Sequence, residues 1–362
     1  MQSCPVNLGF TNHPTLHPSD FVTRLASFPA GHMRICKQDE DVIGADDRMN
    51  VKAQCSGALG MIALLCLIAG IGFRFVPNET PISEIARIFD SLSPWVLAFG
   101  FFLCMILFGL GARVMAFVLS LAIVLGAAEL TWSHRQLSLP RLPDQTHDLR
   151  VLFFNLLGKN AAWGRRIVDA ALEEDADILI FAEADAVYPA LKRLRETHDF
   201  VSPCPYEDCE VLVATKRAPK RFWRLSINEV WDDRYAVSQL ETNNGKSVFV
   251  VGNHLTKPWL SGITEAEHKR LAAQYDWLSG PVVAVGDFNS APWSLPMRTL
   301  MEHTGFRSVR RPLGTWPVVA GDWGVPIDQV LVHNGARVVD MRPFGADFNS
   351  NHRGFVVDIV LP

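Results

Sequence analysis

The sequence predicts an α+β domain that follows a set of membrane-spanning helices, and three observations support this prediction. Three long apolar runs lie before residue 131. After that residue, short apolar runs typical of strands alternate with amphipathic stretches typical of helices. In this part of the chain, strands linked by helices come first, several consecutive strands follow, and strands linked by helices come last. This order favours a sandwich of two sheets with helices on both outer faces.

The apolar runs cover residues 56–73, 94–111 and 113–130. A helix needs roughly 20 apolar residues to cross the hydrocarbon core of a bilayer, with about 17 as the lower limit. A buried helical hairpin of a soluble protein is the alternative, but three runs with so little polar interruption are hard to bury in any other way. We therefore expect residues 49–130 to form a membrane anchor with three transmembrane helices.

The segments on either side of the anchor are polar. Residues 1–48 show no sustained periodicity, so we expect a disordered arm, and Met49 could be the true translation start. Residues 131–147 contain prolines, which is typical of a linker to a folded domain over residues 148–362.

A short helix is expected between the first two runs. Ile82, Ile85, Phe89 and Leu92 recur at helical spacing and form one apolar stripe. Such a stripe suits a helix that lies in the membrane interface, and packing against another protein is the alternative.

Basic residues near the spans favour one orientation. Arg48, Lys52 and Arg113 would be cytoplasmic if the N-terminus is inside, and three spans then place everything after residue 131 outside. Cys204 and Cys209 could form a disulfide there, although a metal pair or two reduced thiols would have the same spacing.

The charge of the chain argues against a general affinity for polyanions. The formal net charge is −4, and 26 basic residues face 28 acidic ones after residue 130. Nucleic-acid-binding domains are often strongly basic, so charge does not indicate nucleic acid as a partner.

Polar residues gather where the predicted strands begin or end. Each of them alone could be a turn residue or a satisfied core side chain. Seven such positions in about two hundred residues favour a shared site, because strand ends of one sheet lie close together. They are Asn155, Glu183, His254, Asp287, Asn289, Asp328 and His352.

Six segments in this part of the chain resemble the signature segments of the endonuclease/exonuclease/phosphatase superfamily, which has a deoxyribonuclease-like fold. They are FFNLLGKN, ILIFAEAD, VVGNHLTKP, VGDFNSAPWS, PIDQVLV and SNHRGF. The resemblance implies a four-layer α/β/β/α sandwich and Mg²⁺-dependent hydrolysis of phosphoesters, with Mn²⁺ as a substitute. The layout with an anchor and TWP before PIDQVLV is similar to bacterial membrane members, and together with the orientation that the basic residues favour we expect the inner membrane and a periplasmic domain.

The resemblance also implies a role for each site residue. Glu183 would be the direct metal ligand and Asn155 its helper. Asp287 would orient or deprotonate the attacking water, and Asn289 would hold a phosphate oxygen.

The two histidines would stabilise charge on the phosphoryl group. In this reading no partner is assigned to His254, whereas Asp328 holds the imidazole of His352 in place and keeps it protonated. Three residues depart from the pattern. Asn351 stands where the superfamily usually has Asp, which makes that metal position doubtful, while Gln329 and Asn253 stand where His and Thr are frequent and remove no catalytic role.

These expectations lead to a membrane-anchored phosphoesterase whose substrate is a nucleic acid, a phospholipid headgroup or a small phosphoester. The alternative is a catalytically weakened, membrane-tethered binding or scaffold protein that retains the fold. Asn351 is the feature that supports the alternative.

Overall fold

The computed structural model describes residues 45–204 and 210–362, and residues 52–362 form one compact unit. The predicted arm therefore lies outside the described residues up to residue 44. Residues 45–48, expected to belong to that arm, already form the first turn of a helix. Cys209 also lies outside the described residues, whereas Cys204 is disulfide-bonded.

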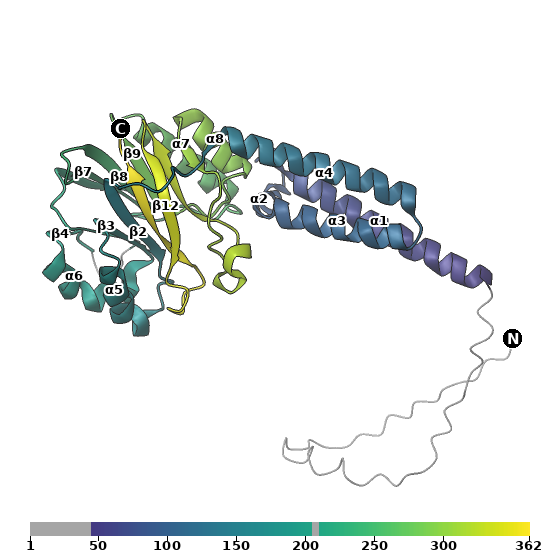
Figure 1. Ribbon diagram of the computed structural model, residues 1–362, viewed down its shortest axis with the longest axis horizontal. Coiled ribbons are helices and arrows are strands. Elements are labelled where there is room, and N and C mark those ends of the chain that lie inside the picture. Colours follow the sequence, from purple (N-terminus) through teal and green to yellow (C-terminus); the bar gives the residue numbers. More distant parts are fainter. Residues whose placement is uncertain (1–44, 205–209) are drawn as a thin grey trace, which may run out of the picture. The chain divides into compact units, whose positions relative to one another are not determined.

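The apolar runs form long helices, and residues 45–136 are called the anchor below after their predicted role (Figure 1). Pro94 occupies the first turn of the second of these, where its missing N–H costs nothing. Gly111, with φ 88°, supplies the left-handed turn between the last two. The helical elements are α1 (Ala45–Ile71), η2 (Gly72–Phe75), α2 (Ser83–Ser91), α3 (Ser93–Gly109) and α4 (Arg113–Gln136).

Two segments of the described chain are long and apolar enough to cross a membrane alone, Val51–Phe75 and Arg113–Gln136. The sequence predicts three spans. Helix α3 has only 17 residues, and it qualifies only together with α2, from which it is bent by 79°.

The short helix α2 forms as predicted, but its polar face is the buried one. Ser83, Arg87 and Asp90 are buried, while Ile82 and Ile85 are each more than half exposed. The first half of the predicted apolar stripe thus faces away from the protein, whereas Phe89 contacts Phe73 and Leu92 packs against the cluster of Ala291, Val325 and Ile327.

The rest of the chain forms two sheets. The first has the strand order β1-β10-β11-β9-β8-β7-β6 and the second β12-β13-β2-β3-β5-β4. Strands of the first sheet are β1 (Ser138–Leu139), β6 (Arg221–Leu225), β7 (Tyr235–Glu241), β8 (Ser247–His254), β9 (Val282–Asp287), β10 (Arg307–Val309) and β11 (Asp328–His333). Strands of the second are β2 (Leu149–Asn155), β3 (Ile178–Ala182), β4 (Phe200–Val201), β5 (Val211–Thr215), β12 (Arg337–Phe344) and β13 (Gly354–Val360).

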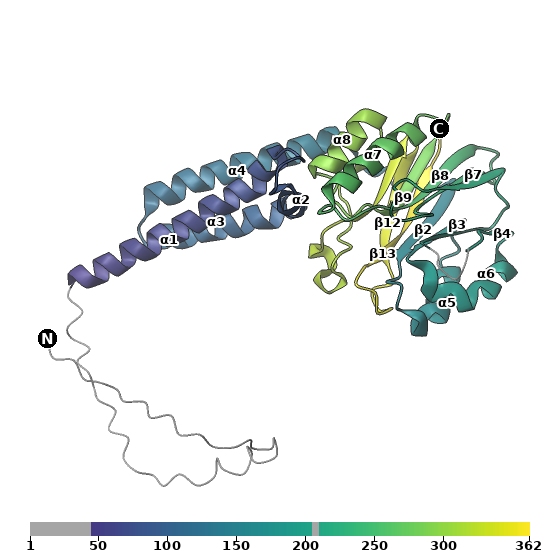
Figure 2. The same ribbon diagram turned by 180° about the vertical axis from the view of Figure 1, so that it is seen from behind.

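Helices cover the outer face of each sheet (Figure 2), which confirms the predicted α+β sandwich. Alternate residues of both sheets meet in a central core that includes Phe153, Val285 and Phe355. The helices of the second sheet are η3 (Ala161–Trp163), α5 (Gly164–Glu173), η4 (Ala184–Ala190) and α6 (Leu191–Thr197). Those of the first sheet are α7 (Ser261–Tyr275) and α8 (Leu295–Thr304), and η6 (Val318–Trp323) lies in the connection to β11.

The segment expected to be a linker is partly regular structure. Helix α4 continues to Gln136, and β1 then pairs in parallel with β10, with Ser138 opposite Ser308. The sheet therefore begins about ten residues before the predicted start of the domain. The sequence did not reveal this edge strand, because a two-residue strand pairs through backbone atoms and shows no apolar pattern.

Strand register brings the predicted site residues to one end of the sandwich. In the first sheet His254 lies opposite Asp287, and Asp328 lies opposite Asp287 from the other side. In the second sheet Asn155 lies opposite Ala182, the residue before Glu183.

Candidate active site

The carboxylate of Asp287 is the centre of the cluster. Its Oδ2 accepts a hydrogen bond from Nδ2 of Asn155 at 3.0 Å. The Nε2 atoms of His254 and His352 lie 3.9 Å and 3.8 Å from the same oxygen. Its Oδ1 accepts a hydrogen bond from the backbone N–H of Asn289 at 2.8 Å.

Burial raises the pKa of Asp287, and the negative charge of Asp328 adds to this effect. The two histidines and the Asn289 N–H act in the opposite direction. A carboxylate with a raised pKa is a better proton acceptor than an ordinary aspartate, so Asp287 is suited to a general base.

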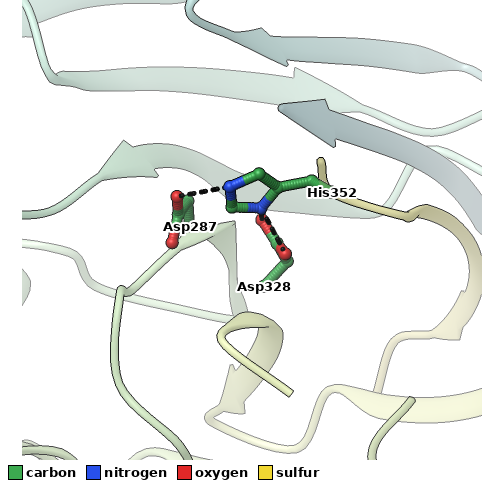
Figure 3. Close-up of side chains that lie close together, drawn as sticks. All are labelled: Asp287, Asp328 and His352. Atoms are coloured by element: carbon green, nitrogen blue, oxygen red, sulfur yellow. Dashed lines mark hydrogen bonds and ion pairs between the residues drawn. The ribbon is translucent and has the colours of Figure 1, made fainter. Parts of the chain in front are cut away.

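His352 and Asp328 form a buried pair (Figure 3). Nδ1 of the imidazole donates to Oδ2 of Asp328 at 2.9 Å. Burial lowers the pKa of His352, but the charges of Asp328 and Asp287 outweigh burial and raise that pKa to about 9. At neutral pH the imidazolium can therefore present a charged donor at Nε2.

The chain around His352 is held by a serine. The Ser350 hydroxyl accepts a hydrogen bond from the His352 N–H at 3.0 Å and donates to the Asn155 carbonyl at 2.8 Å. This links the loop before β13 to the end of β2. Asn351 is exposed, and its carbonyl accepts a hydrogen bond from the Val318 N–H at 2.8 Å.

His254 has a carboxylate partner that the sequence analysis does not include. Nδ1 of His254 donates to Oε2 of Glu210 at 2.8 Å, and Arg234 binds Oε1 at 2.9 Å. Burial raises the pKa of Glu210, but its bond to His254 and the Arg234 charge outweigh burial and lower it. Glu210 opens the apolar run of β5, as Asp328 opens that of β11, so the same strand-end signal could have found it.

Glu183 is the most accessible of the predicted acidic residues. It has a left-handed φ of 49°, and its side chain is 32 % exposed. Oε2 accepts from the Gly158 N–H at 3.0 Å, and Oε1 accepts from Nδ2 of Asn155 at 3.3 Å. Asn155 therefore turns its amide nitrogen to Glu183 and Asp287, while its oxygen accepts from Leu157 N–H.

A cavity of about 320 Å³ opens beside these residues. Asn289, whose Nδ2 donates to the Leu255 carbonyl at 2.8 Å, lies at its edge. The lining has both charges, which suits a site for an anionic group and a cation together. It consists of Gly158, Glu183, Asp185, Glu210, Trp231, Arg234, His254, Lys257, Leu260 and Asn289.

The side chains that could hold a metal ion are Glu183 and the cluster of Asp287, Asp328 and His352. Asp287, Asp328 and His352 have ligand atoms within 4.8 Å of one another. However, Nδ1 of His352 and Asp328 already bind each other, and the imidazole presents nitrogen rather than oxygen. The carboxylate of Glu183 faces the cavity and offers oxygen, the ligand that Mg²⁺ prefers. Glu183 thus offers a ligand that fits a hard divalent cation.

Residues 152–352 match the endonuclease/exonuclease/phosphatase family, which is more than half of the chain. The chain belongs to this family. The match contains every predicted site residue from Asn155 to His352 and leaves the anchor outside it. None of the curated proteins compared with this family member matches it in sequence.

Solved structures with a similar fold include three that this family member covers almost completely. A humanized TDP2 from D. rerio is 15 % identical, with a TM-score of 0.47 over 58 % of this chain and 98 % of that one. Beta toxin from Staphylococcus aureus is 15 % identical, with a TM-score of 0.46 over 58 % and 99 %. An endonuclease/exonuclease/phosphatase from Bacteroides vulgatus is 13 % identical, with a TM-score of 0.47 over 60 % and 100 %. At this identity the likeness extends to the fold alone.

Proposed function

We propose that this family member is a membrane-anchored, Mg²⁺-dependent phosphoesterase. One observation carries the proposal: the imidazoles of His254 and His352 both lie within 4 Å of the buried Asp287 carboxylate, and His254 also lines the cavity. A buried base flanked by two donors suits attack of water on a phosphoryl group whose charge must be stabilised.

Each side chain has a role that its contacts support. Asp287 accepts the proton of the attacking water, and His352, charged by Asp328, donates to a phosphoryl oxygen. His254 is oriented by Glu210 through Nδ1, which leaves Nε2 toward the site. The side-chain amide of Asn289 lines the same cavity and can add a hydrogen-bond donor to those of the two histidines.

Glu183 would hold the divalent cation, and Asn155 orients both its carboxylate and that of the base Asp287. The cation, when bound, neutralises charge on the phosphoryl oxygens. Mn²⁺ has similar ligand preferences and should substitute for Mg²⁺. Asn351 is exposed and outside this set, so the Asn that replaces the usual Asp leaves these residues in place.

We further propose that the anchor spans the inner membrane of a bacterium and that the hydrolase domain is periplasmic. The two long apolar helices and the bent pair α2–α3 support up to three spans. The disulfide of Cys204 is favoured in an oxidising compartment. Tethering raises the local concentration of lipid-linked phosphoesters, while the charge balance gives no general attraction for nucleic acid.

The test uses the purified full chain in detergent with Mg²⁺, Mn²⁺ or a chelator. Bis-p-nitrophenyl phosphate, p-nitrophenyl phosphate, single-stranded DNA and a phospholipid headgroup analogue represent the substrate classes. We expect metal-dependent hydrolysis of at least one of them, and a loss of roughly 1,000-fold in kcat in Asp287→Ala, because general-base and electrostatic contributions of this size are lost together.

The opposite result is equally specific. If wild type and Asp287→Ala hydrolyse all four substrates at the same rate with either metal, the chain is a binding or scaffold protein. The Asn351→Asp variant then checks whether one restored carboxylate creates activity.

A further inference from the structure

The loop that carries Asn289 is held by the membrane anchor. We define the catalytic loop as residues 288–294, between β9 and α8. The last residues of α2 contact this loop and the start of α8 at three points. The N–H of Leu295 donates to Oδ2 of Asp90 at 2.6 Å, the N–H of Ala291 donates to the Ser91 hydroxyl at 3.2 Å, and the indole of Trp293 donates to the Ser91 carbonyl at 3.1 Å.

Asp90 acts as a cap for a helix that is distant in sequence. The first N–H groups of α8 have no partner within the helix, and an acidic group at this end is favourable. The usual capping residue, Ser294, makes no capping bond with its side chain and donates to the Ala291 carbonyl instead. Asp90 is 1 % exposed and supplies the missing acceptor.

The Trp293 side chain adds apolar contacts from the two following anchor helices. Its ring centroid lies 5.8 Å from that of Trp95 on α3 and 6.1 Å from that of His134 on α4. Leu92 and Trp95 also pack against the cluster that contains Ala291. Three anchor helices therefore meet one loop.

The exposure of the α2 side chains indicates that this helix does more than attach the chain to a membrane. A helix that only anchors needs a lipid-facing apolar stripe and has no use for a buried polar face. Helix α2 has both, because Asp90 and Ser91 are buried against the loop while Ile82 and Ile85 are exposed.

The contacts lie close to the chemistry. Ala291 is two residues from Asn289, whose φ of 50° is left-handed, and four from Asp287. The far side of the loop is fixed by Gln329, whose Nε2 donates to the Ser290 carbonyl at 2.6 Å. The loop is thus held between β11 on one side and the end of α2 on the other.

We propose that Asp90 and Ser91 are positioning residues of the active site, so that the anchor is part of the catalytic apparatus as well as a tether. The expected change in turnover rests on the proposed hydrolase function. The expected change in the position of the loop rests only on the contacts described above. Loss of the Ser91 hydroxyl should misplace Asn289 at the edge of the cavity while leaving Glu183 and His254 in place.

The first experiment compares full-length variants in detergent. We expect Ser91→Ala to lower kcat roughly 10-fold with KM changed less than about twofold, because small displacements of a positioned group reduce turnover. Ser91→Thr, which keeps a hydroxyl, should recover most of the rate. Ser93→Ala is the matched control, because Ser93 is also buried and its hydroxyl donates to a backbone carbonyl of α2 rather than to the catalytic loop.

A double-mutant cycle tests whether Ser91 acts through the loop. In an Asn289→Ala background, Ser91→Ala should have little further effect on kcat. In a His254→Ala background it should keep its full effect, because His254 lies at the end of β8 outside the loop. Equal effects in both backgrounds would overturn the inference.

Hydrogen exchange of the amides of residues 289–295 gives a readout that needs no turnover. Ser91→Ala should speed exchange in this segment, and Ser93→Ala should not. If the wild type hydrolyses no phosphoester, the proposed function fails while this measurement still decides the structural contact. Unchanged exchange together with unchanged kcat would refute the role of α2.

Discussion

At the scale of single residues, the pair with Asp328 decides over which pH range His352 carries a charge. The pKa of His352 is raised to about 9, above its ordinary value of 6.5, by the charges of Asp328 and Asp287. The charged imidazole therefore stabilises the fold fully below about pH 6.5, and this stabilisation is lost as pH rises through about 9.

We predict that Asp328→Asn lowers the pKa of His352. The alkaline limb of the pH–rate profile, near pH 9 in the wild type, should move toward neutral pH because one of the two charges that raise the pKa is gone. A profile of kcat/KM against pH measures this, with the exposed Asp340→Asn as control. An unmoved limb would mean that another group controls it.

A second prediction concerns Glu210, which orients His254. Glu210→Gln keeps the shape of the side chain but removes the charge that faces Nδ1 of His254. We expect kcat to fall roughly 10- to 100-fold, because the imidazole loses both its fixed tautomer and its counter-charge. Glu229→Gln, on an exposed pair with Arg270, should leave the rate unchanged. A wild-type rate in Glu210→Gln would remove Glu210 from the site.

At the scale of elements, close approach of β8 and β9 fixes the distance between His254 and Asp287. A Cβ on Gly286 would lie 2.2 Å from the Asn253 carbonyl oxygen, so the two strands meet where only glycine fits.

We predict that Gly286→Ala destabilises the domain by about 1–3 kcal/mol, because the backbone of β8 must move. The change should lower Tm by several degrees in a thermal scan of the full chain. Gly262→Ala is the control, because a Cβ there meets nothing within 4 Å. Equal Tm values for the two variants would contradict the tight strand contact.

The strand ends were predictable from the sequence because apolar runs define strands and their polar ends mark one edge. Asn155, Glu183, His254 and Asp287 all lie where these runs predict. Which of them touch was not predictable, because contact depends on register between strands far apart in the sequence. Glu210 was missed for this reason, although it opens its run as Asp328 does.

The buried polar face of α2 could not be predicted from the sequence, for a different reason. The apolar stripe of Ile82 and Ile85 predicts where the helix meets lipid. Nothing in the pattern of Asp90 and Ser91 indicates that a loop two hundred residues later will accept them as partners. The two-residue strand β1 likewise pairs through backbone atoms and leaves no side-chain signal.

At the scale of the whole molecule, the proposed periplasmic orientation of the domain depends on three spans with the N-terminus inside. We predict that Val319→Cys, at a position 91 % exposed in the hydrolase domain, reacts with a membrane-impermeant maleimide in intact cells. Ala112→Cys, in the turn between α3 and α4, should react only after lysis. The wild-type chain corrects for its own cysteines. The reverse pattern would place the domain in the cytoplasm.

The central claim is that the Asp287 cluster hydrolyses phosphoesters with a divalent cation. Its most direct test is the rate of bis-p-nitrophenyl phosphate hydrolysis by the full chain against Mg²⁺ concentration, for wild type, Asp287→Asn and the exposed control Asp340→Asn. We predict saturable Mg²⁺-dependent turnover in wild type and control, and a loss of roughly 100-fold or more in Asp287→Asn. Equal rates in all three proteins, or turnover that ignores Mg²⁺, would contradict the account.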